Sequence, residues 1–378
     1  MSHPEITLEQ IRRAAVTRTL FAPTDLQSAI ERLEFVQADP IRAPARAQDL
    51  ILRHRVVDYR ARELERRYAT LEVEEDFLPN YGFIPCTLRK WLHPRSFERT
   101  LKIEAETPHL IAQVLEHVRQ NGPTHPRALE KVLGKLSVGN YLGGSSSATT
   151  RVLDALHYRG QLRVARRDAG IKVYEAAHLE PHLENPLEYA EKASRLVHLL
   201  ARLYGPLSET SLGGLVSLLM GYGAPHLKLE LKAAFKHAVK FELERARVEG
   251  VNYVWSSGQN FTLEPDLLEP DLFEPDGEVR LLAPFDPIAW DRRRFAHLFG
   301  WEYKFEAYTP QAKRKFGYYA LPMLWQDRAV GYANLKVSGG VLEADFGYPL
   351  GEPQGTLFKK ALERELERVR VFLGLEGV

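Results

Sequence analysis

Residues 107–173 carry the pattern that most restricts how this chain can fold. They contain three apolar stripes at helical spacing, of which the first is opened by Pro108 and the last is closed by Gly160. Beyond Gly160, apolar residues fall two positions apart on both sides of the turn Asp168-Ala169-Gly170, as in a β-hairpin. The apolar positions are Leu110, Ile111, Val114, Leu115 and Val118, then Ala128 to Leu133, then Val152, Leu153 and Leu156, and finally Leu162, Val164, Ile171 and Val173. Three helices followed by a basic hairpin predict a winged helix, which is built to place its third helix in a DNA groove and its wing on the backbone.

Residues 196–255 repeat this order of elements. A leucine stripe that is broken by Gly205-Pro206 precedes two further apolar helical segments and an alternating run around Glu249-Gly250. The segments are Leu196 to Leu203, Ser208 to Met220, Leu227 to Phe235, and the alternating Phe241, Leu243, Val251, Tyr253 and Trp255. The two regions share the order of their elements rather than their residues, so the repeat is an inference about structure.

The N-terminal region carries two helix starts. Thr7 is followed three positions later by Gln10, Thr24 is followed by Gln27, and apolar residues at helical spacing come after each pair. Two short capped helices that are joined by a tight turn predict a helix-turn-helix.

The last third of the chain has a different character. Glu-Pro-Asp occurs three times between residues 264 and 276, and proline at this spacing prevents helix and sheet alike. We expect an acidic linker here, and an internal mimic of nucleic-acid charge is the alternative. Strand-like runs then precede a final helix from about Thr356. The runs are Tyr303 to Tyr308, Tyr318 to Trp325, Ala329 to Val337 and Val341 to Tyr348.

These patterns predict an α+β protein in which tandem winged-helix units precede a β-rich domain. The expected boundaries are 1–102 for the first winged-helix region, 103–183 and 184–262 for the second and third, 263–278 for the linker and 279–378 for the C-terminal domain.

Several site classes are excluded by what the sequence lacks. Cys86 is the only cysteine, so no internal disulfide or cysteine-rich metal site can form, and a reducing cytoplasm fits. No phosphate-loop, dinucleotide or nucleophile-elbow motif occurs, and we expect no cofactor. His178 and His182 are four residues apart, but a solvated turn is favoured over a metal site. The N-terminus lacks the pattern of a secretion signal, and no apolar run is long enough for a membrane span.

Charge is distributed unevenly although the net charge is only +1. Residues 42–67 contain eight arginines and four acids, and residues 151–172 contain six bases and two acids. Segments of this kind can form a basic face for a polyanion such as DNA, and solvated helix faces are the alternative.

The segment Gly143 to Ser147 precedes the third helix of the second region. A cap for that helix, with Ser146 and Ser147 supplying hydroxyls, is the simpler interpretation. Phosphate binding is the other, and the two agree if the helix enters DNA, because the start of a helix also binds phosphate.

The segment 34–41 places Gln37 and Asp39 two residues apart, directly before Pro40. Aspartate followed by proline is typical of a helix start, where the carboxylate caps the first turn. If the backbone is extended, residues i and i+2 point the same way, so the amide and the carboxylate could instead hold one water molecule.

The stretch Phe35-Val36-Gln37-Ala38-Asp39-Pro40-Ile41, followed by Ala45-Arg46-Ala47, resembles the N-terminal signature of the YcaQ/AlkZ-like winged-helix DNA glycosylases, a family linked to repair of alkylated and crosslinked DNA. Three later stretches resemble landmarks of the same family in the same order. They are Leu281 to Pro287 with Trp290-Asp291-Arg292, Leu298-Phe299-Gly300, and Lys313 to Tyr319 with Leu321-Pro322. The resemblance spans nearly the whole chain, and it implies three winged helices and a β-barrel-like domain around duplex DNA.

The resemblance implies that Gln37 and Asp39 are catalytic. An alkylated purine is cationic and leaves without protonation, so a carboxylate that stabilises the sugar cation and an amide that orients water would suffice. No lysine lies nearby to form a Schiff base, which favours a monofunctional glycosylase. Many members carry a His-Glu-containing segment where this chain has Asn80 to Pro85.

The expected partner is double-stranded DNA, bound by a monomer in the cytoplasm at the nucleoid, without membrane or metal. The residues expected to contact DNA are Arg42, Arg46, Ser146, Ser147, Arg151, Arg163, Arg166, Arg167, Lys313 and Arg314. A non-catalytic winged-helix regulator and a protein-binding adaptor remain the alternatives.

Overall fold

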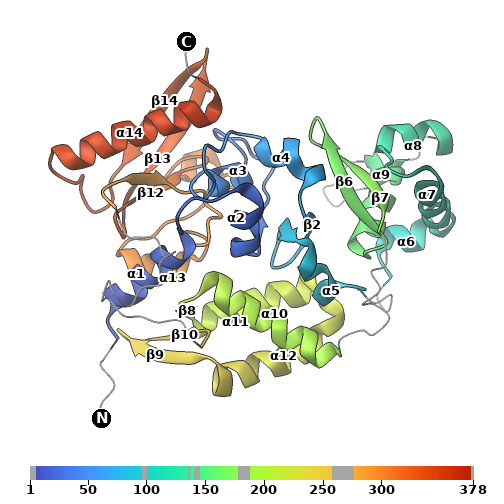
Figure 1. Cartoon of the computed structure of the whole chain (residues 1–378), viewed down its shortest axis with the longest axis horizontal. Coiled ribbons are helices and arrows are strands. Elements are labelled where there is room, and N and C mark those ends of the chain that lie inside the picture. The colour runs from blue at the N-terminus through green and yellow to red at the C-terminus, as the bar shows by residue number, and fades with distance from the viewer. Residues whose placement is uncertain are drawn as a thin grey trace.

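The computed structural model describes residues 6–95, 100–134, 137–139, 145–177, 188–257 and 276–375. Helices and short antiparallel sheets alternate along the chain and pack around hydrophobic clusters in a mixed α/β arrangement (Figure 1). Within these ranges one order of elements occurs three times. It consists of a helix, a short strand or bridge, two helices, and a hairpin whose second strand pairs with the first strand.

The first occurrence surrounds Gln37 and Asp39. Strand β1 forms one edge of an antiparallel sheet in the order β1-β3-β2. The elements are α2 (Leu26–Leu33), β1 (Val36–Gln37), α3 (Ala47–Leu52), α4 (Glu63–Arg67), η1 (Tyr68–Thr70), β2 (Val73–Phe77) and β3 (Tyr81–Pro85), followed by η2 (Cys86–Leu88) and α5 (Arg89–Leu92).

The two N-terminal helices do not pack as one pair, contrary to the expected helix-turn-helix. The capping box that begins at Thr7 opens α1 (Leu8–Thr19) as predicted, but α2 is capped by Asp25 and not by Thr24. The buried face of α1 belongs to a cluster with the third hairpin and the C-terminal region, whereas α2 belongs to the cluster around the first sheet. An apolar stripe shows that a helix is buried, but the partner depends on the whole fold.

The second occurrence matches its predicted helices and hairpin. The turn at Ala169 and Gly170 has φ of 50° and 87°, as two-residue hairpins require, and Thr124 bridges Tyr174 beside the hairpin. The elements are α6 (Lys102–Glu106), α7 (Pro108–Asn121), α8 (Pro126–Leu133), β4 (Ser137–Gly139), β5 (Ser145–Ser147), α9 (Ala148–Tyr158), β6 (Leu162–Asp168) and β7 (Ile171–Ala176).

The third occurrence has the sheet order β8-β10-β9. Its hairpin turns at Glu249 and Gly250 as predicted, but Phe241 lies in the π-helical segment η6 and not in a strand. The elements are α10 (Tyr189–Tyr204), β8 (Leu207–Ser208), α11 (Glu209–Leu218), η4 (Leu219–Gly223), η5 (Pro225–Leu227), α12 (Lys228–His237), η6 (Ala238–Glu242), β9 (Glu244–Val248) and β10 (Val251–Trp255).

The C-terminal region forms an antiparallel sheet in the order β11-β12-β13-β14. Helix α14 packs against this sheet (Figure 1), because Phe358, Ala361 and Phe372 share a cluster with apolar residues of the strands. The elements are β11 (Val279–Leu281), α13 (Arg292–Phe299), η8 (Gln311–Lys313), β12 (Leu321–Trp325), β13 (Arg328–Ser338), β14 (Val341–Gly347) and α14 (Thr356–Leu373).

The expected barrel-like sheet is a half-barrel, of which β11 and β14 form the edges in the described residues. One expectation for this region is wrong, because the run Tyr303 to Tyr308 is irregular although it alternates like a strand. Its aromatic rings pack on other rings instead, such as Phe305 on Phe285 and on Tyr319.

Most of the predicted acidic linker, residues 263–275, lies outside the described residues, as does the pair His178 and His182. Among the helices in the described ranges, none combines the length and the apolar character needed to cross a bilayer.

Candidate active site and nucleic-acid interface

Gln37 is the last residue of strand β1, and Asp39 lies two residues beyond it. Gln37 is paired with Gly82 of β3, and the N–H of Ala38 donates to the carbonyl oxygen of Tyr81, so the backbone stays extended up to Asp39. Side chains two residues apart on an extended chain point the same way. Both Gln37 and Asp39 are 9% exposed, so each is nearly covered but still reachable.

A glycine allows β1 to lie this close to β3. A Cβ atom at Gly82 would stand 2.5 Å from the carbonyl oxygen of Val36 and 2.5 Å from the ring of Phe35. A strand glycine with such contacts marks a close approach of backbone to backbone. Gly82 is therefore part of what positions the Gln37–Asp39 pair.

Asp39 forms a turn and does not start a helix. Its Oδ1 accepts a hydrogen bond from the N–H of Ile41 at 2.9 Å, and its own N–H donates to Oε1 of Gln48 at 3.4 Å. The next helix, α3, begins only at Ala47. Within the described part of the chain Oδ2 of Asp39 has no hydrogen-bond partner, so half of the carboxylate is available to a ligand. Burial raises the pKa of Asp39, and the bond from Ile41 opposes that rise.

The Gln37 amide is oriented by Asn80. Nδ2 of Asn80 donates to Oε1 of Gln37 at 3.3 Å. This bond uses one of the two lone pairs of that oxygen, so Gln37 keeps one acceptor position as well as its amino group for a ligand. The segment Asn80 to Pro85, where the sequence departs from the family pattern, thus lies directly against the candidate motif.

A groove of about 760 Å³ lies beside this turn, between the chain after Asp39 and the C-terminal sheet. Arg42 and Arg314 bring positive charge to it, and the exposed ring of Tyr318 packs against the guanidinium of Arg314 at 5.1 Å. The lining residues are Arg42, Ala43, Pro44, Gln311, Arg314, Gly317, Tyr318, Tyr319, Asn334, Leu335, Lys336, Val337 and Asp345. A groove with this positive charge suits a substrate with a phosphate backbone.

A protein-family model described as "DNA glycosylase AlkZ-like" matches residues 30–372. The chain belongs to this family. It is therefore a DNA repair glycosylase, as the sequence predicted, and it binds DNA. Its fold is similar to that of the Streptomyces sahachiroi DNA glycosylase AlkZ, with a TM-score of 0.61 and 15% identity over 98% of this chain and 97% of that one.

Several arginines that were expected to contact DNA are engaged inside this glycosylase. Arg163 pairs with Glu74 at 3.2 Å, and Arg167 pairs with Glu75 at 2.5 Å. The reason lies in β2, whose consecutive carboxylates are buried and need cationic partners. The remaining pairs are Arg46 with Glu65 at 3.2 Å and Arg166 with Asp168 at 3.0 Å.

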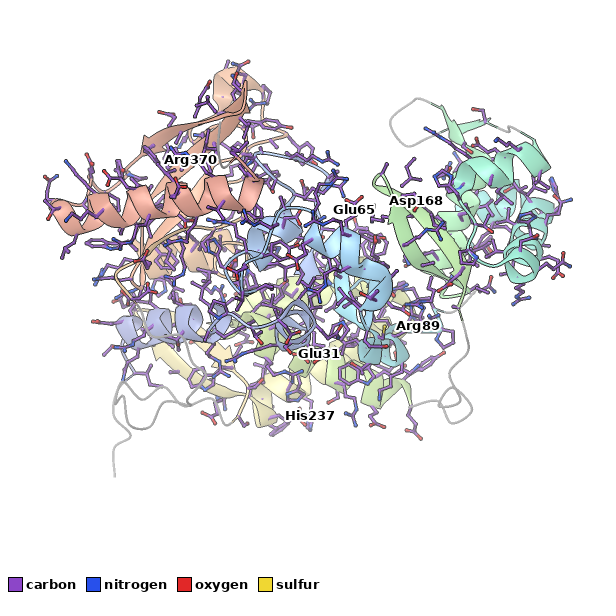
Figure 2. The ribbon with its side chains drawn as sticks, turned by 45° about the horizontal axis from the view of Figure 1, so that its top comes forward. Glu31, Glu65, Arg89, Asp168, His237 and Arg370 are labelled. Carbon is purple, nitrogen blue, oxygen red and sulfur yellow. The ribbon has the colours of Figure 1, made fainter. Side chains whose placement is uncertain are left out.

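The pairs Arg163–Glu74 and Arg167–Glu75 hold the hairpin β6–β7 against the first unit. Asp168 at its tip and Glu65 on α4 lie on facing elements in Figure 2, and a Cβ atom at Gly170 would stand 3.0 Å from the Arg46 guanidinium. The hairpin that was expected to contact the DNA backbone is thus already packed against another part of the glycosylase.

The other expected contacts have different surroundings. Ser147 caps α9, since its Oγ accepts from the N–H of Thr150 at 3.4 Å, while Ser146 lies in β5 and Arg151 on α9. The glycines of the loop, 143 and 144, fall outside the described residues. Lys313 is exposed in η8 near the groove, next to Arg314.

No group of three or more histidine, cysteine, aspartate or glutamate side chains in the described residues of this glycosylase could hold a metal ion. The sequence did not indicate that Asn80 and Gln48 are neighbours of Gln37 and Asp39. It also gave Tyr319 no role, although this residue lies in one of the stretches that resemble the family. Gln48 follows Asp39 by nine residues, and Asn80 and Tyr319 come from segments farther along the chain, so no local pattern indicates any of the three.

Proposed function

We propose that this glycosylase hydrolyses the N-glycosidic bond of alkylated purines in double-stranded DNA, as a monofunctional enzyme that acts as a monomer. The observation that carries the proposal is the Asp39 carboxylate, which is nearly buried, bonded through one oxygen and next to a cationic groove. Asp39 stabilises the sugar cation and accepts a proton from water, and Gln37 orients that water.

The chemistry fits a cationic leaving group. A purine alkylated at N7 or N3 carries a positive charge, so its departure needs no strong general acid. The two residues that are hydrogen-bonded to Asp39 use a side-chain amide, in Gln48, and a backbone N–H, in Ile41, and neither group is a strong acid. A carboxylate in a nearly dry site acts strongly on a developing positive charge, because little water screens it. Bulky crosslinked purines are a further substrate class, since the groove is open along the C-terminal sheet.

The repeated order of elements supports three tandem winged helices, for residues 1–102, 103–183 and 184–262, before the linker at 263–278 and the C-terminal domain at 279–378. Each hairpin has its second strand in the middle, paired with a strand or bridge that follows the first helix. The same connectivity in three places favours one kind of unit over three unrelated folds.

The direct test is incubation of the wild-type chain with duplex DNA that carries N7-methylguanine. We expect free base and abasic sites without strand cleavage, measured by chromatography of the base and by alkali treatment of the DNA. Salt-sensitive DNA binding without any base release would contradict the proposal and favour a regulator.

Neutralising the groove is expected to weaken DNA binding. The change of Arg42 or Arg314 to alanine should reduce affinity several-fold and lower the slope of log K against log[salt] by about 1 each, because each contributes one phosphate contact. Fluorescence anisotropy at several salt concentrations measures both. The control is Arg370→Ala on α14 (Figure 2), where an exposed arginine pairs with Glu367 and its loss should leave both values unchanged. Unchanged salt slopes for Arg42 and Arg314 would remove them from the interface.

A further inference from the structure

Tyr319 carries a buried hydroxyl that has no hydrogen-bond partner in the described part of the chain. The residue is only 2% exposed, and its ring stands nearly perpendicular to that of Phe305 at 5.3 Å. A buried donor without a partner costs about 1–3 kcal/mol, and such groups in folded proteins call for an explanation. The ring would pack equally well as phenylalanine, so packing does not explain the oxygen.

A neighbouring tyrosine shows what a structural hydroxyl looks like in this region. Tyr303 is equally buried, and its hydroxyl donates to the carbonyl oxygen of Ala320 at 2.8 Å. Within the described residues, this part of the fold therefore provides an acceptor for the hydroxyl of Tyr303 but no partner for that of Tyr319.

Tyr319 lies near the candidate active site. Tyr319 lines the groove together with Arg42 and Pro44, which follow directly after the Asp39 turn. Burial raises the pKa of Tyr319, and the Asp39 carboxylate raises it further. The phenol thus remains a hydrogen-bond donor, within electrostatic reach of a carboxylate oxygen that is itself unbonded.

We propose that Tyr319 is a catalytic residue whose hydroxyl donates a hydrogen bond to the water that Asp39 activates. The inference rests on the proposed function of Asp39. Water suits the place between the two groups, because it accepts one hydrogen bond from the phenol and donates another to the carboxylate.

In the reaction the water oxygen forms a bond to C1′ of the deoxyribose, and the bond from C1′ to the purine nitrogen breaks. The electron pair of that bond goes to the cationic base, which leaves neutral, and one proton of the water goes to Asp39. The phenol keeps its proton and donates to one lone pair of the water, while the second proton of the water is held by the free lone pair of the Gln37 amide oxygen. The other lone pair of the water therefore points at C1′. The attacking water is thus held by Asp39 from the N-terminal region and by Tyr319 from the C-terminal region.

The test is Tyr319→Phe, which removes one oxygen. Single-turnover base release from an N7-methylguanine duplex at saturating enzyme should fall about 10-fold to 100-fold, the lower part of the range for a positioned hydrogen-bonding group. The Kd for the same duplex should not change. The thermal midpoint should stay or rise, since the lost oxygen has no partner in the protein.

Two tyrosines of the same region are the controls. Tyr308→Phe alters an exposed hydroxyl of the same region, on a residue that does not line the groove, and should leave the rate constant unchanged. Tyr303→Phe removes a bonded hydroxyl and should lower the thermal midpoint without slowing base release at saturation. In the variant that combines D39N and Y319F, release should be no slower than in D39N alone, because both residues serve one water.

Three outcomes would overturn the inference. They are an unchanged rate constant for Y319F, a rate loss at low enzyme concentration that disappears at saturating enzyme because only the Kd has changed, and a fall in thermal midpoint as large as that of Y303F. Each can be told apart from failure of the proposed function, in which the wild type releases no base or D39N releases it as fast as the wild type.

Discussion

Replacing Asp39 with asparagine is expected to slow base release from an N7-methylguanine duplex by on the order of 10³-fold. Asparagine has nearly the same shape, and its oxygen can still accept the hydrogen bond that Ile41 now donates to Oδ1. The turn should therefore persist while the negative charge is lost. Single-turnover kinetics measure the effect, and thermal denaturation checks that the variant is folded.

The pH dependence gives the same prediction a second readout. Burial raises the pKa of Asp39 above that of an ordinary aspartate. Only the ionised carboxylate accepts a proton and stabilises the sugar cation, so the rate should fall as pH decreases through this raised pKa and level off above it. The D39N variant should lose this limb of the profile.

The matched control is Asp58→Asn. Asp58 is an exposed residue with φ of 50°, a conformation that asparagine tolerates well, so the change removes one negative charge without strain. Its rate and pH profile should equal those of the wild type. If D39N were also as fast as the wild type, the carboxylate would have no part in the reaction.

Features set by neighbouring residues could be predicted from the sequence. The capping box at Thr7 and the turns at Ala169-Gly170 and Glu249-Gly250 formed where they were expected. Each depends on dihedral preferences and hydrogen bonds within a few residues, which a short stretch of sequence determines. The helices between them followed from apolar spacing for the same reason.

Features set by distant partners could not be predicted in this way. The alternation from Tyr303 to Tyr308 suggested a strand, yet the run is irregular and the ring of Phe305 packs on Phe285 and Tyr319. The arginine runs suggested a DNA surface, yet Arg163 and Arg167 neutralise carboxylates of β2. A count of charges along the chain gives no information about which opposite charge is buried next to each one.

The residues of the candidate site also fall into those indicated by a local pattern and those brought in by distant segments. Gln37 and Asp39 were indicated by a short motif and by the geometry of an extended chain. The donor from Asn80, the close approach at Gly82 and the open hydroxyl of Tyr319 come from other elements, and only the folded chain brings them together.

Replacing Arg95 with methionine is expected to destabilise the protein by about 3–5 kcal/mol, the range for removing one partner of a buried ion pair. Arg95 is fully buried, and its guanidinium donates to Asp76 at 2.8 Å. It also donates to the carbonyl oxygens of Tyr158 at 2.6 Å and Gly223 at 2.7 Å. These partners belong to the first, second and third occurrences of the repeated order, so a single side chain ties all three together.

Methionine fills similar space but donates no hydrogen bond, which leaves the Asp76 carboxylate buried with His93 and the N–H of Phe77 as its remaining partners. Although burial opposes it, Arg95 and His93 hold the pKa of Asp76 far below its usual value. A depressed folded-state pKa contributes stability above the unfolded pKa of about 4 and loses it as pH falls below that value. Without Arg95 this contribution shrinks, so R95M should show a weaker loss of stability on acidification than the wild type.

Urea unfolding of R95M and of Arg202→Met separates this role from general loss of a charge. Arg202 pairs with Glu34 at the surface with 45% of its side chain exposed, so its loss should cost less than about 1 kcal/mol. An equal midpoint for R95M and the wild type would show that the contacts of Arg95 contribute little stability.

Because the guanidinium joins the three repeated units, its removal should also split a single cooperative transition into separate steps, as the units unfold at their own denaturant concentrations. A lowered midpoint with one sharp transition would instead mean that packing between the units, rather than Arg95, makes them unfold together.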